Sequence, residues 1–206
     1  MTQRVLLLGA TGGVGSACCA LMSADPAYHV TEWSSQDLDL NYPERIFGHD
    51  ISDYDILLNC TGHNQGTYRG FLDNSYENQL SQIMVNYVSN VMLLKHYARS
   101  RTHGKYVWCS TVLTEGVTPF KGLYLSTKLA SAFAIDLIRQ EATHISVLEA
   151  QFGAVRSGMR YRNFEGTRTP QEIEDTYNGS MVLSPDAVAQ QLIMALQQDL
   201  EKVLIQ

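Results

Sequence analysis

Two groups of residues in this chain have types and spacings suited to redox chemistry on a small molecule. The first is the run Gly9-Ala10-Thr11-Gly12-Gly13-Val14-Gly15 near the N-terminus. Glycine is needed where backbone turns sharply and approaches a pyrophosphate, because a Cβ atom would stand in the way. A helix that begins there offers free N–H groups and a positive dipole end to phosphates. The run predicts a dinucleotide site; the alternative is a tight turn that binds nothing.

The second group is Tyr124 and Lys128, four positions apart in Tyr-Leu-Ser-Thr-Lys. On a helix this spacing puts the phenol and the ammonium on one face. A free phenol has a pKa of about 10, which is too high for proton transfer at neutral pH. A nearby ammonium favours the phenolate, so we expect it to lower the pKa of Tyr124. Taken alone, the pair is also compatible with a solvated helix face.

Short apolar runs alternate with helical stretches along the chain. The expected strands are 5–8, 28–33, 37–40, 55–60, 106–109, 145–149 and 202–205. The expected helices are 13–22, 43–47, 77–100, 123–141 and 185–198, with irregular segments at 63–75 and 153–183. This alternation predicts an α/β fold with a single Rossmann-type, doubly wound parallel sheet and helices on both faces. We expect one domain over residues 1–206, with a substrate lid at about 154–183.

The composition is globular and limits the function classes. The chain has 206 residues, 45% of them hydrophobic and 17% charged, which suits one domain. Its net charge of −6 argues against nucleic-acid or anionic-membrane partners, because neutralising phosphates needs clustered Lys and Arg. We recognise no apolar run that would span a bilayer and no signal peptide. The four cysteines lack metal-ligand spacing, which predicts free thiols, no metal site and a cytoplasmic location.

Together, the glycine run and Tyr-x-x-x-Lys resemble the short-chain dehydrogenase/reductase family over nearly the whole chain. The glycines fit the patterns of the family's branches, although Leu8 stands where one branch has threonine. Further matches are Asp39-Leu40, Asn59-Cys60-Thr61-Gly62, Asn86, Thr111 and Phe152-Gly153-Ala154-Val155-Arg156-Ser157. Compared with the family, we expect the chain to lack the second helix and the C-terminal extension, which there help to form the substrate pocket and tetramer contacts.

The resemblance implies an NAD(P)-dependent oxidoreductase that interconverts a carbonyl and an alcohol by hydride transfer. Tyr124 would be the acid–base catalyst, and Lys128 would lower its pKa and bind the nicotinamide ribose. Thr111 would hold the substrate oxygen, with Ser110 as the alternative if the strand end shifts by one residue. Asn86 would position a water that relays protons to Lys128. The implied cofactor-binding residues are Gly9, Thr11, Gly12, Gly13, Val14, Gly15, Ser34, Ser35, Asp39, Leu40, Asn59, Cys60, Thr61, Gly62, Lys128 and Gly153.

NADP is favoured over NAD as the cofactor. Ser34 and Ser35 follow the second strand, where NAD enzymes carry an acid, and hydroxyls bind a 2′-phosphate without repelling it. Glu32 would reverse this preference if the strand register differed by two residues. The expected substrate is a small carbonyl or alcohol, and the resemblance implies a homodimer or homotetramer through helices 77–100 and 123–141.

Other readings remain open. Four arginines, at 156, 160, 162 and 168, allow an anionic substrate but also suit a solvated lid. His63 follows the strand at 55–60, where a hydrogen-bonded loop histidine is the simpler interpretation. The chain could instead be a non-catalytic dinucleotide-binding or redox-sensing protein, although such a protein does not need Tyr124. It could also be a nucleotide-sugar epimerase or dehydratase of the extended branch, although that branch normally has a larger substrate domain.

Overall fold

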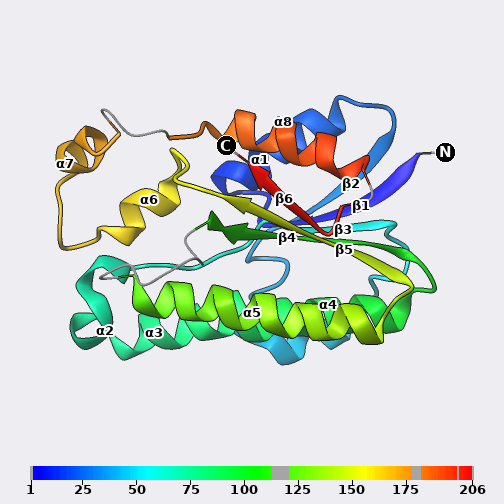
Figure 1. Cartoon of the computed structure of the whole chain (residues 1–206), viewed down its shortest axis with the longest axis horizontal. Coiled ribbons are helices and arrows are strands. Elements are labelled where there is room, and N and C mark those ends of the chain that lie inside the picture. Colours follow the sequence, from blue (N-terminus) through cyan, green and yellow to red (C-terminus); the bar gives the residue numbers. More distant parts are fainter. Residues whose placement is uncertain (1, 113–120, 178–181, 199, 206) are drawn as a thin grey trace.

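The computed structural model describes residues 2–112, 121–177, 182–198 and 200–205. Within them, six parallel strands form one sheet in the order β2-β1-β3-β4-β5-β6 (Figure 1). The strands are β1 (Gln3–Leu8), β2 (Tyr28–Trp33), β3 (Ile56–Asn59), β4 (Gly104–Thr111), β5 (Ile145–Phe152) and β6 (Lys202–Ile205). The α-helices are α1 (Gly13–Ser23), α2 (Gly70–Asp73), α3 (Tyr76–Ile83), α4 (Ser89–Ser100), α5 (Gly122–Glu141), α6 (Gly158–Asn163), α7 (Pro170–Asp175) and α8 (Pro185–Leu196). Two short 3₁₀ helices, η1 (Pro43–Gly48) and η2 (Thr67–Arg69), and a π-helical turn, η3 (Met84–Val88), complete the elements.

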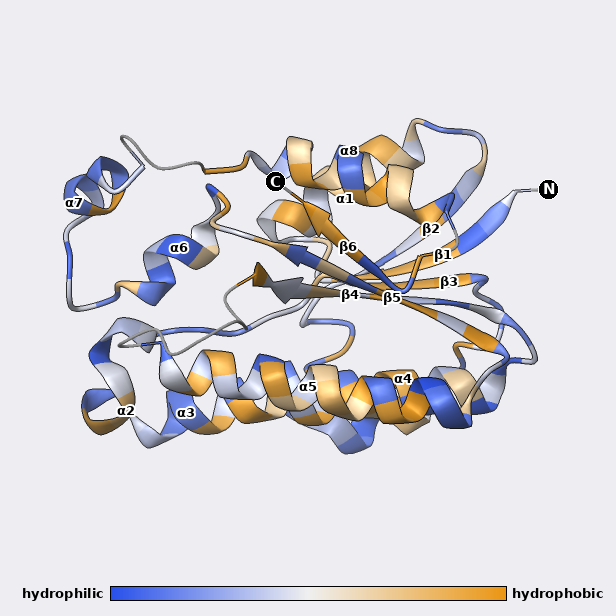
Figure 2. Ribbon diagram, viewed as in Figure 1, coloured by the Kyte–Doolittle hydropathy of each residue, from blue (hydrophilic) through white to orange (hydrophobic). Residues whose placement is uncertain are grey.

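Helices cover both faces of the sheet, which confirms the predicted doubly wound fold. α1 and α8 lie on one face, and α4 and α5 lie on the other (Figure 1). Along β1, Val5 and Leu7 pack into the core beneath α1 and α8, while Leu6 and Leu8 pack into the core on the opposite face. A strand buried on both faces is apolar along its length, as β3 and most of β1 are in Figure 2.

The prediction of a strand at Asp37–Leu40 is wrong. The Asp37 carboxylate accepts hydrogen bonds from the backbone N–H of Ser34 (2.8 Å) and from its hydroxyl (2.9 Å), which folds the segment into a turn. Leu38 and Leu40 are buried in the core under η1 rather than paired in a ladder. The short segment between β2 and η1 therefore replaces a strand, and β2 forms the edge of the sheet.

The helical segments differ from the prediction in two places. The expected helix 77–100 is interrupted by η3, whose wider turn shifts the residues on either side of Asn86. The segments expected to be irregular contain η2 and α2 in 63–75, and α6 and α7 in 153–183. Part of the expected lid at 154–183 lies outside the described residues.

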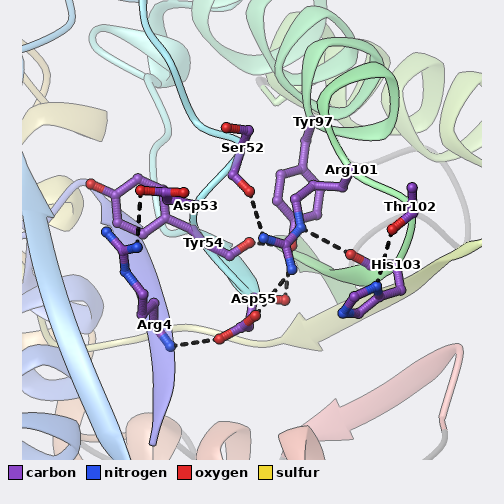
Figure 3. Close-up of polar contacts among 9 residues, drawn as sticks. All are labelled: Arg4, Ser52, Asp53, Tyr54, Asp55, Tyr97, Arg101, Thr102 and His103. Atoms are coloured by element: carbon purple, nitrogen blue, oxygen red, sulfur yellow. Dashed lines mark hydrogen bonds and ion pairs between the residues drawn. The ribbon is translucent and has the colours of Figure 1, made fainter.

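A network of polar contacts fastens the amino ends of β1 and β3 (Figure 3). Asp55 accepts from the backbone N–H of Arg4 (2.9 Å) and from the guanidinium of Arg101 (3.0 Å). The Tyr97 hydroxyl lies 2.9 Å from the carbonyl oxygen of Tyr54, and burial raises the pKa of this phenol. These groups satisfy one another, so this end of the sheet is structural. The opposite, carboxyl end contains the cavity.

No helix in the described part of the chain is long and apolar enough to cross a bilayer.

Candidate functional site

A cavity of about 550 Å³ opens at the carboxyl ends of the strands. The chain leaves β1 toward β2 on one side and returns to β3 on the other, so the loops after β1 and β3 diverge. Such a switch point is where doubly wound sheets bind ligands. Most of the predicted site residues line the cavity: Gly9, Thr11, Gly12, Gly13, Val14, Ser34, Ser35, Asp39, Leu40, Cys60, Thr61, Gly62, Ser110, Thr111, Tyr124, Lys128 and Gly153. Gly15, Asn59 and Asn86 do not line it.

The glycine loop is shaped by contacts that exclude side chains. Gly9 has a left-handed φ of +80°, and the N–H of Gly12 donates to its carbonyl oxygen (2.9 Å). A Cβ atom on Gly15 would lie 2.8 Å from the carbonyl carbon of Gly9 and closer still to its oxygen. No side chain caps the N-terminus of α1. Its first N–H groups are therefore available to a bound anion.

Two carboxylates stand beside the end of the cavity nearest β2. Ser34 and Ser35 line it, but the Ser34 hydroxyl donates to Asp37 and accepts from the N–H of Gln36 (3.1 Å). Hydrogen bonds from Ser34 lower the pKa of Asp37, so this carboxylate is charged at neutral pH. Asp39 also lines the cavity at this end. Glu32 pairs with Leu7, one residue short of the strand end, and does not line the cavity.

The loop after β3 is held by two asparagines rather than left free. The Oδ1 atom of Asn59 accepts from the N–H (3.1 Å) and the hydroxyl (2.6 Å) of Thr61. Asn86 lies in η3; its Oδ1 accepts from the N–H of His63 (2.8 Å), and its Nδ2 donates to the carbonyl of His63 (2.7 Å). Both polar atoms of Asn86 are thus engaged by protein, and its direct effect is to fix the loop that carries His63.

Tyr124 and Lys128 share one face of α5, as their spacing predicts. Lys128 is 4% exposed and donates to the carbonyl of Cys109 (2.8 Å), and its Nζ lies 5.9 Å from the centre of the Tyr124 ring. Burial lowers the pKa of Lys128 from 10.5 to about 8. Burial also raises the pKa of Tyr124, so the expected lowering is wrong for this structure. Desolvation opposes charge on both groups and is the largest cause of each shift.

The end of β4 supplies two hydroxyls to the cavity. Ser110 and Thr111 are 2% and 5% exposed, and both line it. The Ser110 hydroxyl has no hydrogen-bond partner among the described residues, which is costly for a buried polar group unless a ligand completes it. Of the two predicted oxygen-binding residues, Ser110 therefore has the clearer need for a ligand.

Several residues at the far end of the cavity were not among the predicted catalytic and cofactor-binding residues, although the sequence left an anion-binding role open for Arg160 and Arg162. They are His63, Asn64, Tyr68, Lys121, Met159, Arg160, Arg162 and Asn163. Burial, followed by the charge of Arg162, lowers the pKa of His63. Lys121 lies three residues before Tyr124, and a helical spacing argument would have placed it beside the site. No spacing rule would have found Tyr68 or Asn163, which tertiary contacts bring in.

The described residues contain no cluster of His, Cys, Asp and Glu that could hold a metal ion. The Sγ atoms of Cys60 and Cys109 lie 3.8 Å apart at neighbouring strand ends, and all four cysteines are free thiols.

Neither a protein-family model nor a curated protein matches this sequence. Solved structures do match. A small-chain dehydrogenase in complex with NADPH superposes with a TM-score of 0.82 at 16% identity, over 99% of this chain and 96% of that one. A short chain dehydrogenase from Burkholderia cenocepacia in complex with NADP superposes with a TM-score of 0.81 at 15% identity, over 100% of this chain and 90% of that one. An alcohol dehydrogenase from Thermococcus sibiricus complexed with 5-hydroxy-NADP superposes with a TM-score of 0.75 at 18% identity, over 99% of this chain and 96% of that one. The chain therefore has the fold of the short-chain dehydrogenases/reductases.

Proposed function

We propose that this protein is a short-chain dehydrogenase/reductase that interconverts a carbonyl and an alcohol on a small molecule, using a nicotinamide dinucleotide. One observation carries the proposal. A single cavity brings the uncapped N-terminus of α1 together with a half-buried phenol, a buried ammonium and a buried hydroxyl that has no partner among the described residues, those of Tyr124, Lys128 and Ser110. A dinucleotide-binding protein without chemistry does not need the last three groups.

The residues present fit a dinucleotide. The close approach of Gly15 to Gly9 keeps the N-terminus of α1 against the strand end, where its N–H groups would hold the pyrophosphate. Lys128 uses one donor on the carbonyl of Cys109, which leaves its other protons for ribose hydroxyls. Cys60, Thr61, Gly62 and Gly153 line the cavity between these groups and would form the walls around the cofactor.

The bound cofactor would supply the hydride, and the protein would control the proton. Tyr124 would donate its phenolic proton to the substrate oxygen during reduction, while Ser110 holds that oxygen by a hydrogen bond. Burial keeps the phenol protonated at neutral pH, which suits an acid. Thr111 would flank the same oxygen. Asn86 would act as a positioning residue for the His63 loop; the water relay expected for it remains a prediction.

The charges near β2 favour NAD over NADP. The sequence-based preference for NADP assumed free hydroxyls at Ser34 and Ser35, but the Ser34 hydroxyl is bonded to the charged carboxylate of Asp37. In the described part of the chain, the Lys and Arg side chains that line the cavity are Lys121, Lys128, Arg160 and Arg162, and none of these belongs to the β2 end. A 2′-phosphate beside Asp37 would be repelled. Asp37→Asn should therefore raise the affinity for NADPH relative to NADH, and an unchanged ratio of dissociation constants would contradict this assignment.

We also propose a homodimer in the cytoplasm. Leu129, Phe133 and Leu137 follow one another at intervals of four on α5 and are 45%, 69% and 47% exposed. Such a stripe on a helix matches a partner helix. The free cysteines suit a reducing compartment.

The function is tested by following reduced nicotinamide absorbance with a panel of ketones and aldehydes and either NADH or NADPH. We expect turnover that Tyr124→Phe removes while cofactor affinity is kept. Tight cofactor binding without turnover of any carbonyl or alcohol would instead support a non-catalytic dinucleotide-binding protein.

A further inference from the structure

Three cations, Lys121, Arg160 and Arg162, line the end of the cavity farthest from β2. Among the described residues, the acidic residue that lines the cavity is Asp39, which stands at the β2 end. The ion pairs among the described residues involve Arg4, Arg101, Arg139 and Arg156, and none includes these three cations. Within the same residues, the guanidinium of Arg162 forms no hydrogen bond. Cations without carboxylate partners in a cavity attract an anion.

Contacts between η2 and α6 hold this positive end beside the reactive residues. The rings of Tyr68 and Phe164 stack at 3.9 Å, and the N–H of Gly66 donates to the carbonyl of Arg162 (3.0 Å). The Nζ of Lys121 lies 5.4 Å above the Tyr68 ring, just before α5 and its Tyr124. Lys121 and Arg160 therefore pack against one aromatic pair next to the catalytic face of α5, with the Arg160 guanidinium 5.2 Å from the centre of the Phe164 ring. Arg162 is exposed and lines the same end of the cavity.

Buried polar atoms that have no hydrogen-bond partner among the described residues line the same end. They are Nε2 of His63, Oδ1 of Asn64 and Oδ1 of Asn163. Asn64 is only 4% exposed, so bulk water does not satisfy it. A buried polar atom without a partner destabilises a fold, and several of them in one cavity indicate that a polar ligand completes their hydrogen bonds. The imidazole can donate to an anion, and the amide oxygens can accept from hydroxyls of the substrate.

We propose that the substrate carries an anionic group, a carboxylate or a phosphate, which Arg162 and Lys121 bind while its carbonyl lies against Tyr124 and Ser110. The proposal rests on the proposed function and names its substrate class. In the reaction, hydride from the reduced nicotinamide forms the new C–H bond and the proton of Tyr124 forms the O–H bond. The product is a hydroxy acid or a hydroxyalkyl phosphate, and the anion itself is unchanged. Guanidinium binds both oxyanions in a fork geometry.

Matched pairs of charged and neutral substrates test this inference. Pyruvate, acetoacetate and levulinate are compared with their methyl esters, and dihydroxyacetone phosphate with dihydroxyacetone, using NADH and the intact protein. We expect at least one anion to exceed its neutral partner in kcat/KM by roughly tenfold to a hundredfold, the range of a charge-assisted contact. The carboxylate pairs and the phosphate pair are measured separately, so the result shows which of the two anionic groups the protein prefers. Neutral compounds that equal or exceed every anion would overturn the proposal.

The variant Arg162→Gln tests whether Arg162 causes the preference for the anionic substrate. It should remove most of the preference for the anion while the neutral partner and the affinity for NADH stay unchanged. Arg168→Gln is the matched control, because Arg168 lies in the same segment over the Phe164 ring but does not line the cavity. Equal losses for anion, neutral partner and NADH would mean that Arg162 serves the cofactor, which also overturns the proposal.

A binding measurement covers the case in which no compound of the panel is reduced. The same anions and inorganic phosphate are then added to the NAD-saturated protein, with sodium chloride at equal ionic strength as the control. We expect an increase in Tm that Arg162→Gln abolishes, because a ligand of the native state stabilises it. No increase from any anion would contradict the inferred substrate class. Failure to bind NADH, measured separately, would contradict the proposed function itself.

Discussion

Replacing Lys128 by methionine should stabilise the protein in a way that depends on pH. The ammonium is 4% exposed and has one hydrogen bond to a described residue, the carbonyl of Cys109, so burying its charge costs folding free energy. Its pKa falls from 10.5 to about 8 on folding. At about 1.4 kcal/mol per pH unit, this difference corresponds to about 3 kcal/mol. Loss of the hydrogen bond offsets about 1 kcal/mol of the gain at neutral pH.

Proton linkage determines how the stability difference between the wild-type protein and Lys128→Met changes with pH. Below pH 8 both folded and unfolded chains carry the proton, and the folded chain bears the full cost of the buried charge. Between pH 8 and 10.5 the unfolded chain binds more protons, so the stability of the wild-type protein rises with pH relative to Lys128→Met. The advantage of the variant should therefore shrink by about 3 kcal/mol across this window.

Urea unfolding at a series of pH values, followed by tryptophan fluorescence and circular dichroism, measures this difference. The other titrating groups are shared by the two proteins and largely cancel. Lys95→Met, at an exposed position on α4, is the matched control and should follow the wild-type protein. A difference between Lys128→Met and wild type that stays constant from pH 8 to 10.5 would refute the buried-cation interpretation.

Three further changes test other parts of the site. Gly15→Val should abolish dinucleotide binding in titration calorimetry, because its side chain would collide with Gly9, whereas Gly48→Val, where a Cβ atom meets nothing within 4 Å, should bind normally. Tyr124→Phe should keep the fold and the cofactor affinity but lower kcat by roughly a hundredfold or more, and turnover at the wild-type rate would exclude it as the acid. Phe133→Arg should halve the mass measured by light scattering, and a wild-type mass near that of one chain would disprove the dimer.

Much of the fold could be predicted because its signals are local. β2 and β6 have the expected bounds, although these edge strands have only one buried residue each. The apolar runs of β1 and β3 mark the buried centre of the sheet. The glycine loop and the Tyr124–Lys128 spacing also placed their residues in one cavity. The segment at 37–40 was misassigned because its alternating leucines imitate a strand, while the hydrogen bonds of Asp37 to Ser34 fold it into a turn.

The remaining errors come from tertiary contacts. The π turn at Asn86 cannot be recognised from the spacing of apolar residues. The effect of Asn86 on His63 depends on two hydrogen bonds between distant segments. The pKa of Tyr124 was expected to fall because sequence shows its charged neighbour but not its burial. The sequence left an anion-binding role for Arg160 and Arg162 open but could not place them in the cavity, because the contact of Tyr68 with Phe164 joins residues far apart in the chain.

The central claim is that this chain binds a nicotinamide dinucleotide at the N-terminus of α1 and uses it for chemistry at Tyr124. Titration calorimetry of NADH and of NADPH into the purified protein tests this most directly, with Gly15→Val as the variant that blocks the site. We expect saturable binding of one dinucleotide per chain, tighter for NADH, and no binding to Gly15→Val when circular dichroism shows it folded. No heat of binding from either dinucleotide, or equal binding by folded Gly15→Val, would contradict the account.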